Sequence, residues 1–163
     1  MYKIGDYIIY LKDVCQVLDI KEKYMNDMDY YVLTPVNDNS LKLNIPINNK
    51  SLRNLISKEK IEEIINNILN IEIIKDDDKT IENTYKSLLS SANHEDLIKI
   101  IKTSYLRNQK RIDNKKKISD KDKNYFELAE KYLYNEFSIV LGLSFDETKD
   151  YVIKKVIEGI ENA

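Results

Sequence analysis

Apolar and polar residues alternate over short stretches in the first third of the chain. Runs rich in β-branched and aromatic residues cover positions 7–10, 14–20, 30–34 and 41–45. Turn-forming residues separate these runs: Asn26-Asp27, Pro35 and the cluster at positions 37–40. Four or five short strands in so few residues favour a small, strongly bent antiparallel sheet or barrel.

From Ser57 onward the apolar positions repeat at helical spacing. Ile61, Ile64 and Ile65 begin one apolar stripe, which Ser57 can cap. The run of aspartates at positions 76–78 predicts a loop. Further start signals are Thr80, Asn93, Ser119 and Ser144, and Gly142 is a stop signal. We therefore expect an α+β chain of two domains, with a β domain of residues 1–56 and a five-helix domain of residues 57–163.

Basic residues concentrate between Lys99 and Lys123, although the whole chain has a net charge of -2. Ten basic residues face three acidic ones there, so this segment carries a charge of +7. A local basic patch can bind phosphate by releasing counterions even when the protein is acidic overall. The alternative is a solvated loop with its two flanking helix ends.

The chain lacks the usual residues of enzymatic and metal sites. Cys15 is the only cysteine and His94 the only histidine, so a zinc site of the structural type and an internal disulfide are excluded. Cys15 lies in a strand pattern and is expected to be buried, whereas His94 follows a helix cap. The three glycines form no phosphate loop. We expect no catalytic residue, no metal and no cofactor.

Several segments, in order along the chain, resemble CarD-like bacterial transcription regulators. Residues 3–10 read KIGDYIIY and resemble the opening KxGDxVVYP of that family. Residues 43–49 read LNIPINN and are similar to its IPVDN segment, and residues 51–57 read SLRNLIS and resemble its GLRxLIS boundary. Residues 85–89, 106–110, 118–123 and 129–133 follow the same order and spacing. The resemblance spans nearly the whole chain.

The resemblance implies a Tudor-like N-terminal domain that binds the β subunit of RNA polymerase through a sheet edge, by adding a strand. In this sequence the implied contacts are Lys23, Lys42, Asn44, Ile45 and Pro46. Asn44 stands where the family has a basic residue, and Lys42 lies two residues away on the same strand face. The alternative for Lys23 and Lys42 is a solvent-facing strand position.

For the helical domain, the resemblance implies contact with promoter DNA at the upstream edge of the transcription bubble. The position of the family's wedge tryptophan holds Ile81, which either enters the minor groove or belongs to the helix core. Asn83 and Thr84 replace the two arginines that often follow the tryptophan. Lys123 matches a family lysine, with Asp122 at the preceding acid. The candidate DNA contacts are Lys79, Ile81, Lys86, Arg107, Lys110, Arg111, Lys121 and Lys123.

The hypothesis from sequence is a non-catalytic regulator, tethered to polymerase, that changes the stability of the open promoter complex through largely sequence-independent contacts with the minor groove and backbone. The first alternative is an adaptor that binds polymerase but has lost DNA contact. A nucleic-acid-processing enzyme that uses the acidic loop and a divalent cation is the second. We expect a cytoplasmic, nucleoid-associated protein without membrane contact, either a monomer or a domain-swapped dimer.

Overall fold

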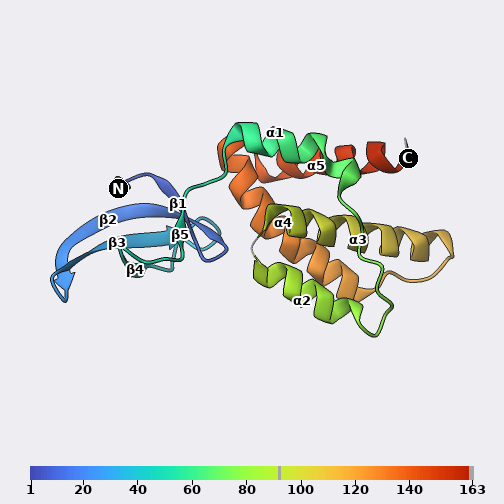
Figure 1. Ribbon diagram of the computed structural model, residues 1–163, viewed down its shortest axis with the longest axis horizontal. Coiled ribbons are helices and arrows are strands. Elements are labelled where there is room, and N and C mark those ends of the chain that lie inside the picture. Colours follow the sequence, from blue (N-terminus) through green and yellow to red (C-terminus); the bar gives the residue numbers. More distant parts are fainter. Residues whose placement is uncertain (92, 162–163) are drawn as a thin grey trace. The chain divides into compact units, whose positions relative to one another are not determined.

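The computed structural model describes residues 1–91 and 93–161, except for the side chain of residue 160. Its contacts divide the chain into two compact units, Met1–Ile56 and Ser57–Ala163, which we call the β unit and the helical unit. A five-stranded antiparallel sheet comes first, and five α-helices follow within the described residues (Figure 1). The predicted α+β class is therefore confirmed. Residues 92, 162 and 163 of the predicted helical domain lie outside the described part.

The sheet of the β unit has the strand order β4-β3-β2-β1-β5. Its strands are β1 (Tyr7–Tyr10), β2 (Asp13–Met25), β3 (Met28–Pro35), β4 (Leu43–Pro46) and β5 (Leu52–Arg53). All pairings are antiparallel. Compared with the sequence expectation, β2 continues five residues beyond position 20, and β5 is a two-residue strand that the periodicity did not indicate.

The order of the strands requires the sheet to bend. β4 and β5 occupy opposite edges, yet only residues 47–51 connect them. Four strand spacings in a flat sheet would separate these edges by about 19 Å. The connection itself contains turns, because Asn49 N–H donates to the carbonyl of Pro46 (3.0 Å) and Leu52 N–H to that of Asn49 (3.3 Å). So short a connection reaches across only when the sheet curls around its core.

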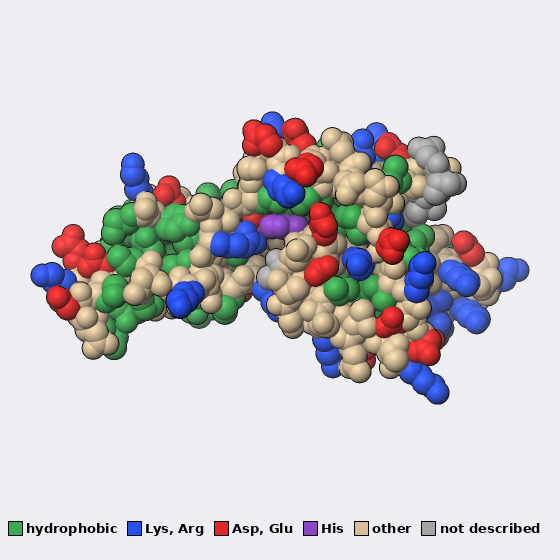
Figure 2. Space-filling model, viewed as in Figure 1, with side chains coloured by type: hydrophobic (Ala, Val, Ile, Leu, Met, Phe, Trp, Pro, Cys, Tyr) green, Lys and Arg blue, Asp and Glu red, His purple; other side chains and the backbone are tan. Residues whose placement is uncertain are grey.

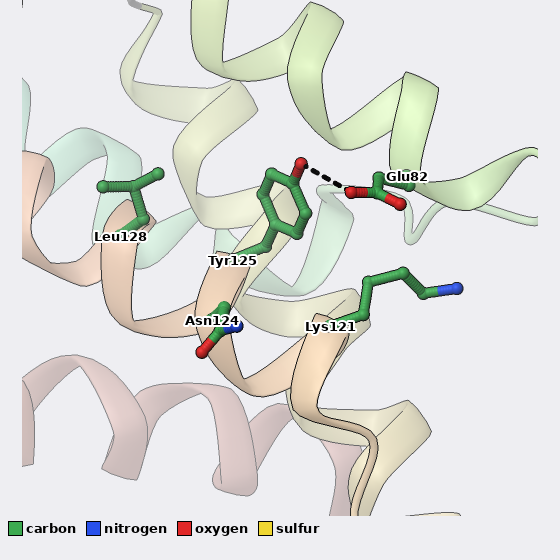
Figure 3. A pocket seen from close by; sticks show the side chains of 5 residues that line it. All are labelled: Glu82, Lys121, Asn124, Tyr125 and Leu128. Atoms are coloured by element: carbon green, nitrogen blue, oxygen red, sulfur yellow. Dashed lines mark hydrogen bonds between the residues drawn. The ribbon is translucent and has the colours of Figure 1, made fainter.

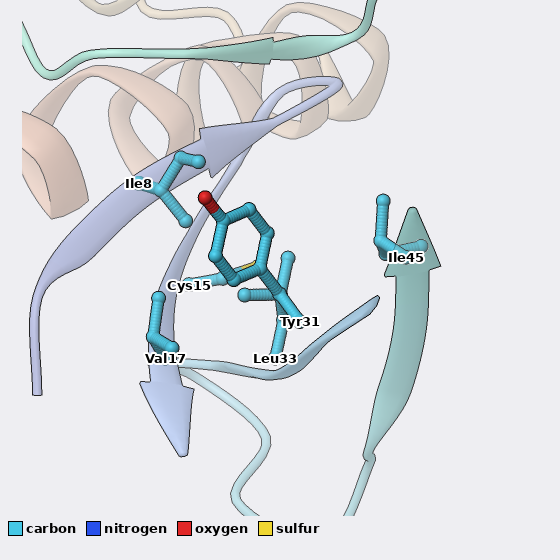
Figure 4. Close-up of a cluster of buried hydrophobic side chains, with 6 residues drawn as sticks. All are labelled: Ile8, Cys15, Val17, Tyr31, Leu33 and Ile45. Atoms are coloured by element: carbon cyan, nitrogen blue, oxygen red, sulfur yellow. The ribbon is translucent and has the colours of Figure 1, made fainter. Parts of the chain in front are cut away.

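One face of the curled sheet forms a closed apolar core (Figure 4). The buried side chains come from the first four strands and are Ile8, Cys15, Val17, Tyr31, Leu33 and Ile45. Cys15 is fully buried, as its strand position predicted. Burial and the nearby charge of Asp13 raise the pKa of the Cys15 thiol to about 11, so it stays protonated near neutral pH.

The β2–β3 hairpin extends to a tight two-residue turn. Asn26 and Asp27 both have positive φ, at 52° and 57°, as a type I′ turn requires. The pairing of β2 with β3 shifts register between Val17 and Asp19 and again between Lys21 and Met25. Such bulges bend a strand and increase its local twist. They therefore allow the long β2–β3 hairpin to follow the curvature of the sheet.

The helical unit contains α1 (Lys58–Asn66), the short 3₁₀ helix η1 (Ile68–Asn70), α2 (Ile81–Ser91), α3 (His94–Asp113), α4 (Asp120–Leu141) and α5 (Phe145–Glu161). Three predicted caps are confirmed by hydrogen bonds: the side chain of Ser57 accepts from Lys60 N–H, that of Asn93 from Glu95 N–H, and that of Ser119 from Asp122 N–H. η1 was not predicted, and Asp77 rather than Thr80 accepts the backbone N–H bonds before α2.

The C-terminal turn of α4 is closed by glycine. Gly142 has φ 68°, a left-handed conformation that glycine adopts without strain. The next helix begins with a reciprocal capping box, because Glu147 N–H donates to Ser144 Oγ (3.0 Å) and Ser144 N–H to Glu147 Oε1 (3.2 Å). The glycine closure and the capping box were both predicted, and together they fix the turn between α4 and α5. No helix in the described residues is long and apolar enough to cross a membrane.

Candidate functional site

Lysine and arginine side chains gather at the end of the helical unit where α3 is joined to α4 (Figures 1 and 2). α3 places Arg107, Lys110 and Arg111 on neighbouring positions of its last turns, at i, i+3 and i+4. The carbonyl end of a helix favours cations. The connecting segment then adds Lys115, Lys116 and Lys117, all exposed.

Local hydrogen bonds fix the segment between α3 and α4. Lys116 N–H donates to the carbonyl of Arg111 (2.8 Å), and Lys115 has φ 58°, which is the left-handed closure of a helix end. The Nε of Arg111 donates to the carbonyl of Lys117 (2.7 Å). Ser119 N–H donates to Asn108 Oδ1 (2.8 Å). The chain is thus folded back on α3, and Lys116 is placed beside the arginines.

Behind this basic end lies a buried ionic network. Asp122, in the first turn of α4, is fully buried. It accepts hydrogen bonds from the hydroxyl of Tyr85 (2.7 Å) and from the Nε of Arg107, which contacts its two carboxylate oxygens at 3.1 and 3.2 Å. A buried carboxylate needs such partners to offset its lost hydration. The network therefore ties α2, α3 and α4 together and fixes the orientation of Arg107.

The acidic loop before α2 is engaged by its neighbours. Asp76 accepts a hydrogen bond from the hydroxyl of Thr84, and Asp77 Oδ1 accepts from the N–H of Lys79 (3.0 Å). Asp78 forms an ion pair with Nη2 of Arg107, whose guanidinium lowers the pKa of that carboxyl. No group of three or more histidine, cysteine, aspartate or glutamate side chains in the described residues could hold a metal ion.

A hollow of about 250 Å³ opens between this loop and the end of α3. Four cationic side chains, one amide and one carboxylate line it; these are Arg107, Lys110, Arg111, Lys116, Asn114 and Asp78. Lys110 and Lys116 are exposed and make no ion pair within the described residues. Asp78 is the one carboxylate in this described lining, and the buried Asp122 carboxylate binds Arg107 from behind. An excess of positive charge remains.

A second hollow, of about 460 Å³, lies between α2 and α4 (Figure 3). Tyr125 donates a hydrogen bond to Glu82 Oε1 (3.2 Å) across it, and Asn124, Lys121 and Leu128 complete the lining. In Figure 3 the Lys121 side chain points away from Tyr125. Its ammonium donates to the carbonyl of Asp78 (3.2 Å), so Lys121 connects the two hollows.

A third, apolar hollow of about 170 Å³ lies between α3 and α4 near Lys123. Tyr105 and Phe126 contribute their rings, with centroids 6.5 Å apart. Ile112 and Ile118, which are 52% and 40% exposed, also line it. Lys123 is exposed at its rim and makes no ion pair in the described residues. Apolar and cationic surfaces therefore adjoin at this end of the helical unit.

The structure separates the predicted DNA contacts into three groups. Lys110, Arg111 and Lys123 lie on the basic end, with Lys121 at its border. Lys79 and Lys86 are exposed elsewhere, on the acidic loop and on the outer face of α2, where Lys86 approaches Glu82 (4.0 Å). The third group consists of residues that the fold itself uses.

Two predicted DNA contacts belong to this third group. Ile81 is fully buried, so its side chain belongs to the helix core and is not placed to enter a base step. Arg107 is not a free phosphate contact either, because Asp122 and Asp78 already bind its guanidinium. Lys102, which contributed to the sequence charge count, is also buried, and its ammonium donates to the carbonyls of Ile68 (2.9 Å) and Ile71 (2.8 Å).

In the β unit, the outer edge of β4 pairs with no strand in the described part of the chain. Ile47 N–H donates to the carbonyl of Asp29 (3.1 Å), in register with the pairs Tyr31↔Ile45 and Leu33↔Leu43. Hydrogen-bonded and non-hydrogen-bonded pairs alternate along an antiparallel ladder. The backbone N–H and C=O of Asn44 therefore point to the outer edge, whereas those of Ile45 bond to β3.

The predicted polymerase contacts do not form one cluster. Lys42 and Asn44 are exposed at the β4 edge, Pro46 ends that strand, and Ile45 is 8% exposed in the core, where it can contribute only to the shape of the strand. Lys23 lies near the tip of the β2–β3 hairpin and approaches Asp27 (3.9 Å). Lys23 is level with Asp29 of β3 and Lys42 with Thr34, five positions further along, so the two lysines lie about 17 Å apart along the strand direction.

Three residues of the basic hollow were not among the predicted contacts: Asp78, Asn114 and Lys116. Lys116 was counted in the basic segment but carried no distinguishing signal. Asp78 reads from sequence as part of an acidic loop, and only the fold brings it to Arg107, 29 positions later in the chain. Asn114 could have been predicted as a residue that ends a helix, but not as one that lines a hollow.

No protein-family model matches the chain, and no curated protein sequence matches it either.

Proposed function

We propose that this chain is a non-catalytic transcription regulator that binds the RNA polymerase β subunit through its β unit and contacts promoter DNA, close to the upstream edge of the transcription bubble, through its helical unit. The observation that carries the proposal is a set of exposed cations at one end of an otherwise acidic protein, which make no ion pair with any described residue: Lys110, Lys116 and Lys123. The sequence resemblance to CarD-like regulators supplies the identity of the partners.

The composition of the basic end supports backbone contact with nucleic acid. Lysine ammonium groups on flexible stems suit phosphate oxygens, which carry no sequence information. The amides of Asn108 and Gln109 at this end of α3 bond within the helical unit, to Ser119 and Asp113, so they are not free to bond base edges. Affinity for free DNA should be modest and fall steeply with salt, and a tether to polymerase would raise the effective DNA concentration.

The free edge of β4 supports docking of the β unit on a protein. An unpaired strand edge can accept a strand from a partner, and its backbone groups then provide the affinity. Asn44 presents one donor and one acceptor at this edge, and Lys42 adds a positive charge beside it. A small bent sheet with such an edge fits the Tudor-like domain that the resemblance implies.

An adaptor that binds polymerase without touching DNA is the second candidate. The buried side chain of Ile81 and the internal ion pairs of Arg107 favour it, because both residues stand at implied DNA contacts. The two candidates differ in whether the basic end of the helical unit matters for DNA binding and promoter opening.

The DNA arm is tested by removing three charges from the basic end. Lys110, Lys116 and Lys123 are changed together to glutamine in the full chain, and the control changes Lys50, Lys58 and Lys154, which are exposed elsewhere. Binding to a fluorescent forked duplex is followed by anisotropy at several salt concentrations. The proposal predicts weaker binding and a slope of log K against log [salt] reduced by about 2–3 for the first variant only. Equal behaviour of both variants would favour the adaptor.

The polymerase arm is tested at the sheet edge. Asn44→Pro removes the outward N–H of β4 but leaves the bonds to β3 in place, whereas Asn44→Thr keeps the N–H. Retention of purified bacterial RNA polymerase by the immobilised full chain should be lost with proline and kept with threonine. Retention that is unchanged by proline would show that the β4 edge is not the docking surface.

A further inference from the structure

We propose that the hollow at the end of α3 is a subsite for one phosphate group, and that the carboxylate of Asp78 occupies the ligand position in the free protein. This inference deepens the proposed function, on which its assignment to nucleic acid rests. The subsite itself rests on the geometry around Arg107. In that case the acidic loop of the helical unit would lower the affinity of the same unit for phosphate.

The position of Arg107 carries the first step. Its Nε is committed to the buried Asp122, so the guanidinium plane is held from behind. Its Nη2 faces the hollow and binds Asp78 there. Carboxylate and phosphate oxygens accept the same guanidinium donors. A phosphate oxygen could therefore replace the Asp78 oxygen without any rearrangement of Arg107.

The surroundings of Arg107 carry the second step. Lys110, Arg111 and Lys116 line the same hollow, and Arg111 and Lys116 are fixed by the closed segment after α3. Within the described lining, one carboxylate stands against four cations, and the buried Asp122 carboxylate also binds Arg107. Two positive charges remain when both carboxylates are counted. A phosphate dianion complements that charge better than one aspartate does, and a phosphodiester, with the same single charge as aspartate, offers oxygens to several of these cations at once.

Asp78 has the properties of a replaceable occupant. Its side chain is 77% exposed, whereas that of Arg107 is 26% exposed. Its carboxylate bonds only to Arg107 among the described residues, and an exposed ion pair contributes little to stability. The loop can therefore release this carboxylate at small cost, while Lys121 still binds the backbone carbonyl of Asp78.

The test compares Asp78→Asn with Asp113→Asn in the full chain. Asp113 is an exposed carboxylate at the end of α3 that accepts a hydrogen bond from Gln109, so both variants lose one negative charge near the hollow. Inorganic phosphate is titrated against each protein and followed by amide NMR shifts, with chloride at equal ionic strength as the blank. The same proteins are then titrated with the forked duplex.

Asp78→Asn should bind inorganic phosphate and the duplex about five-fold more tightly than the wild type at low salt, since one exposed charge pair has about that effect. The largest phosphate-induced shifts should fall at residues 107–116. Asp113→Asn should change the affinities for inorganic phosphate and for the duplex by less than about two-fold. Lys116→Gln, placed on the Asp78→Asn background, should reverse the gain.

The remaining outcomes separate the subsite from the proposed function. Tighter phosphate binding by Asp78→Asn, without duplex binding by any variant, supports a subsite for a small phosphate compound and removes the DNA contact. Duplex binding that Asp78→Asn and Asp113→Asn change equally overturns the subsite and leaves the proposed function in place. Absence of phosphate-induced shifts at residues 107–116 overturns it as well.

Discussion

The hydrogen bond from Tyr85 to Asp122 gives a sharp test of the buried network. Both residues are fully buried, and the bond measures 2.7 Å to a carboxylate. Tyr85→Phe keeps the ring and creates no cavity, but it removes the donor, while Asp122 keeps both contacts with Arg107. Hydrogen bonds to charged groups contribute about 1.5–3 kcal/mol, so the free energy of unfolding should fall by that amount. The midpoint of thermal unfolding should fall by about 6 °C or more.

Tyr125→Phe is the matched control. The ring centroid of Tyr125 lies 5.0 Å from that of Tyr85, but the Tyr125 hydroxyl donates to Glu82 at a half-exposed position. Removing this hydroxyl should therefore lower the free energy of unfolding by less than about 0.5 kcal/mol. Urea unfolding followed by circular dichroism at 222 nm, which reports mainly on the helices, gives both values. Equal losses in the two variants would refute the claim that the buried bond to Asp122 stabilises the helical unit.

Three further predictions concern other buried groups. Ile81→Ala should cost about 2–5 kcal/mol of unfolding free energy, as in other cores; a DNA wedge would instead lose DNA binding with little change in stability. Lys102→Met removes the ammonium that donates to the buried carbonyls of Ile68 and Ile71. The Ile68 carbonyl still accepts from the Ile71 N–H, so the loss should be about 1–3 kcal/mol in urea unfolding. Burial lowers the pKa of Lys102, so the folded state binds this proton less tightly than the unfolded chain does. The free energy of unfolding of the wild type, relative to that of Lys102→Met, should therefore rise with pH between the lowered pKa and 10.5, the ordinary value of lysine. The Cys15 thiol, with its pKa raised to about 11, should react with a disulfide reagent at pH 8 far more slowly in the native chain than in urea; equal rates would contradict its burial.

Local signals predicted most of the fold because each has a local physical cause. The Asn26-Asp27 turn, the Asn93 and Ser119 caps and the Gly142 closure all depend on residues within a few positions of each other. β5 was missed because two residues carry no periodicity. The boundaries of β2 were missed because its bulges interrupt the alternation of apolar and polar positions.

The candidate site was predicted less completely, because burial depends on contacts between distant segments. Sequence counted Lys102 and Arg107 as surface charges, but carbonyls of η1 bind the first and a buried aspartate binds the second. Only the fold brings Asp78 to Arg107. For Ile81 the sequence left core and wedge open, and its full burial places it in the core.

We propose that the chain, bound to polymerase, acts on the promoter through the basic end of its helical unit. Opening of a promoter carrying a fluorescent base at the upstream bubble edge is measured with purified polymerase and the full chain. We expect the wild type to change the open fraction. Asn44→Pro and the triple variant of Lys110, Lys116 and Lys123 should both lose this effect, while Asn44→Thr should keep it. A wild-type chain that neither binds polymerase nor changes the open fraction would show that the protein does not regulate promoter opening in this way.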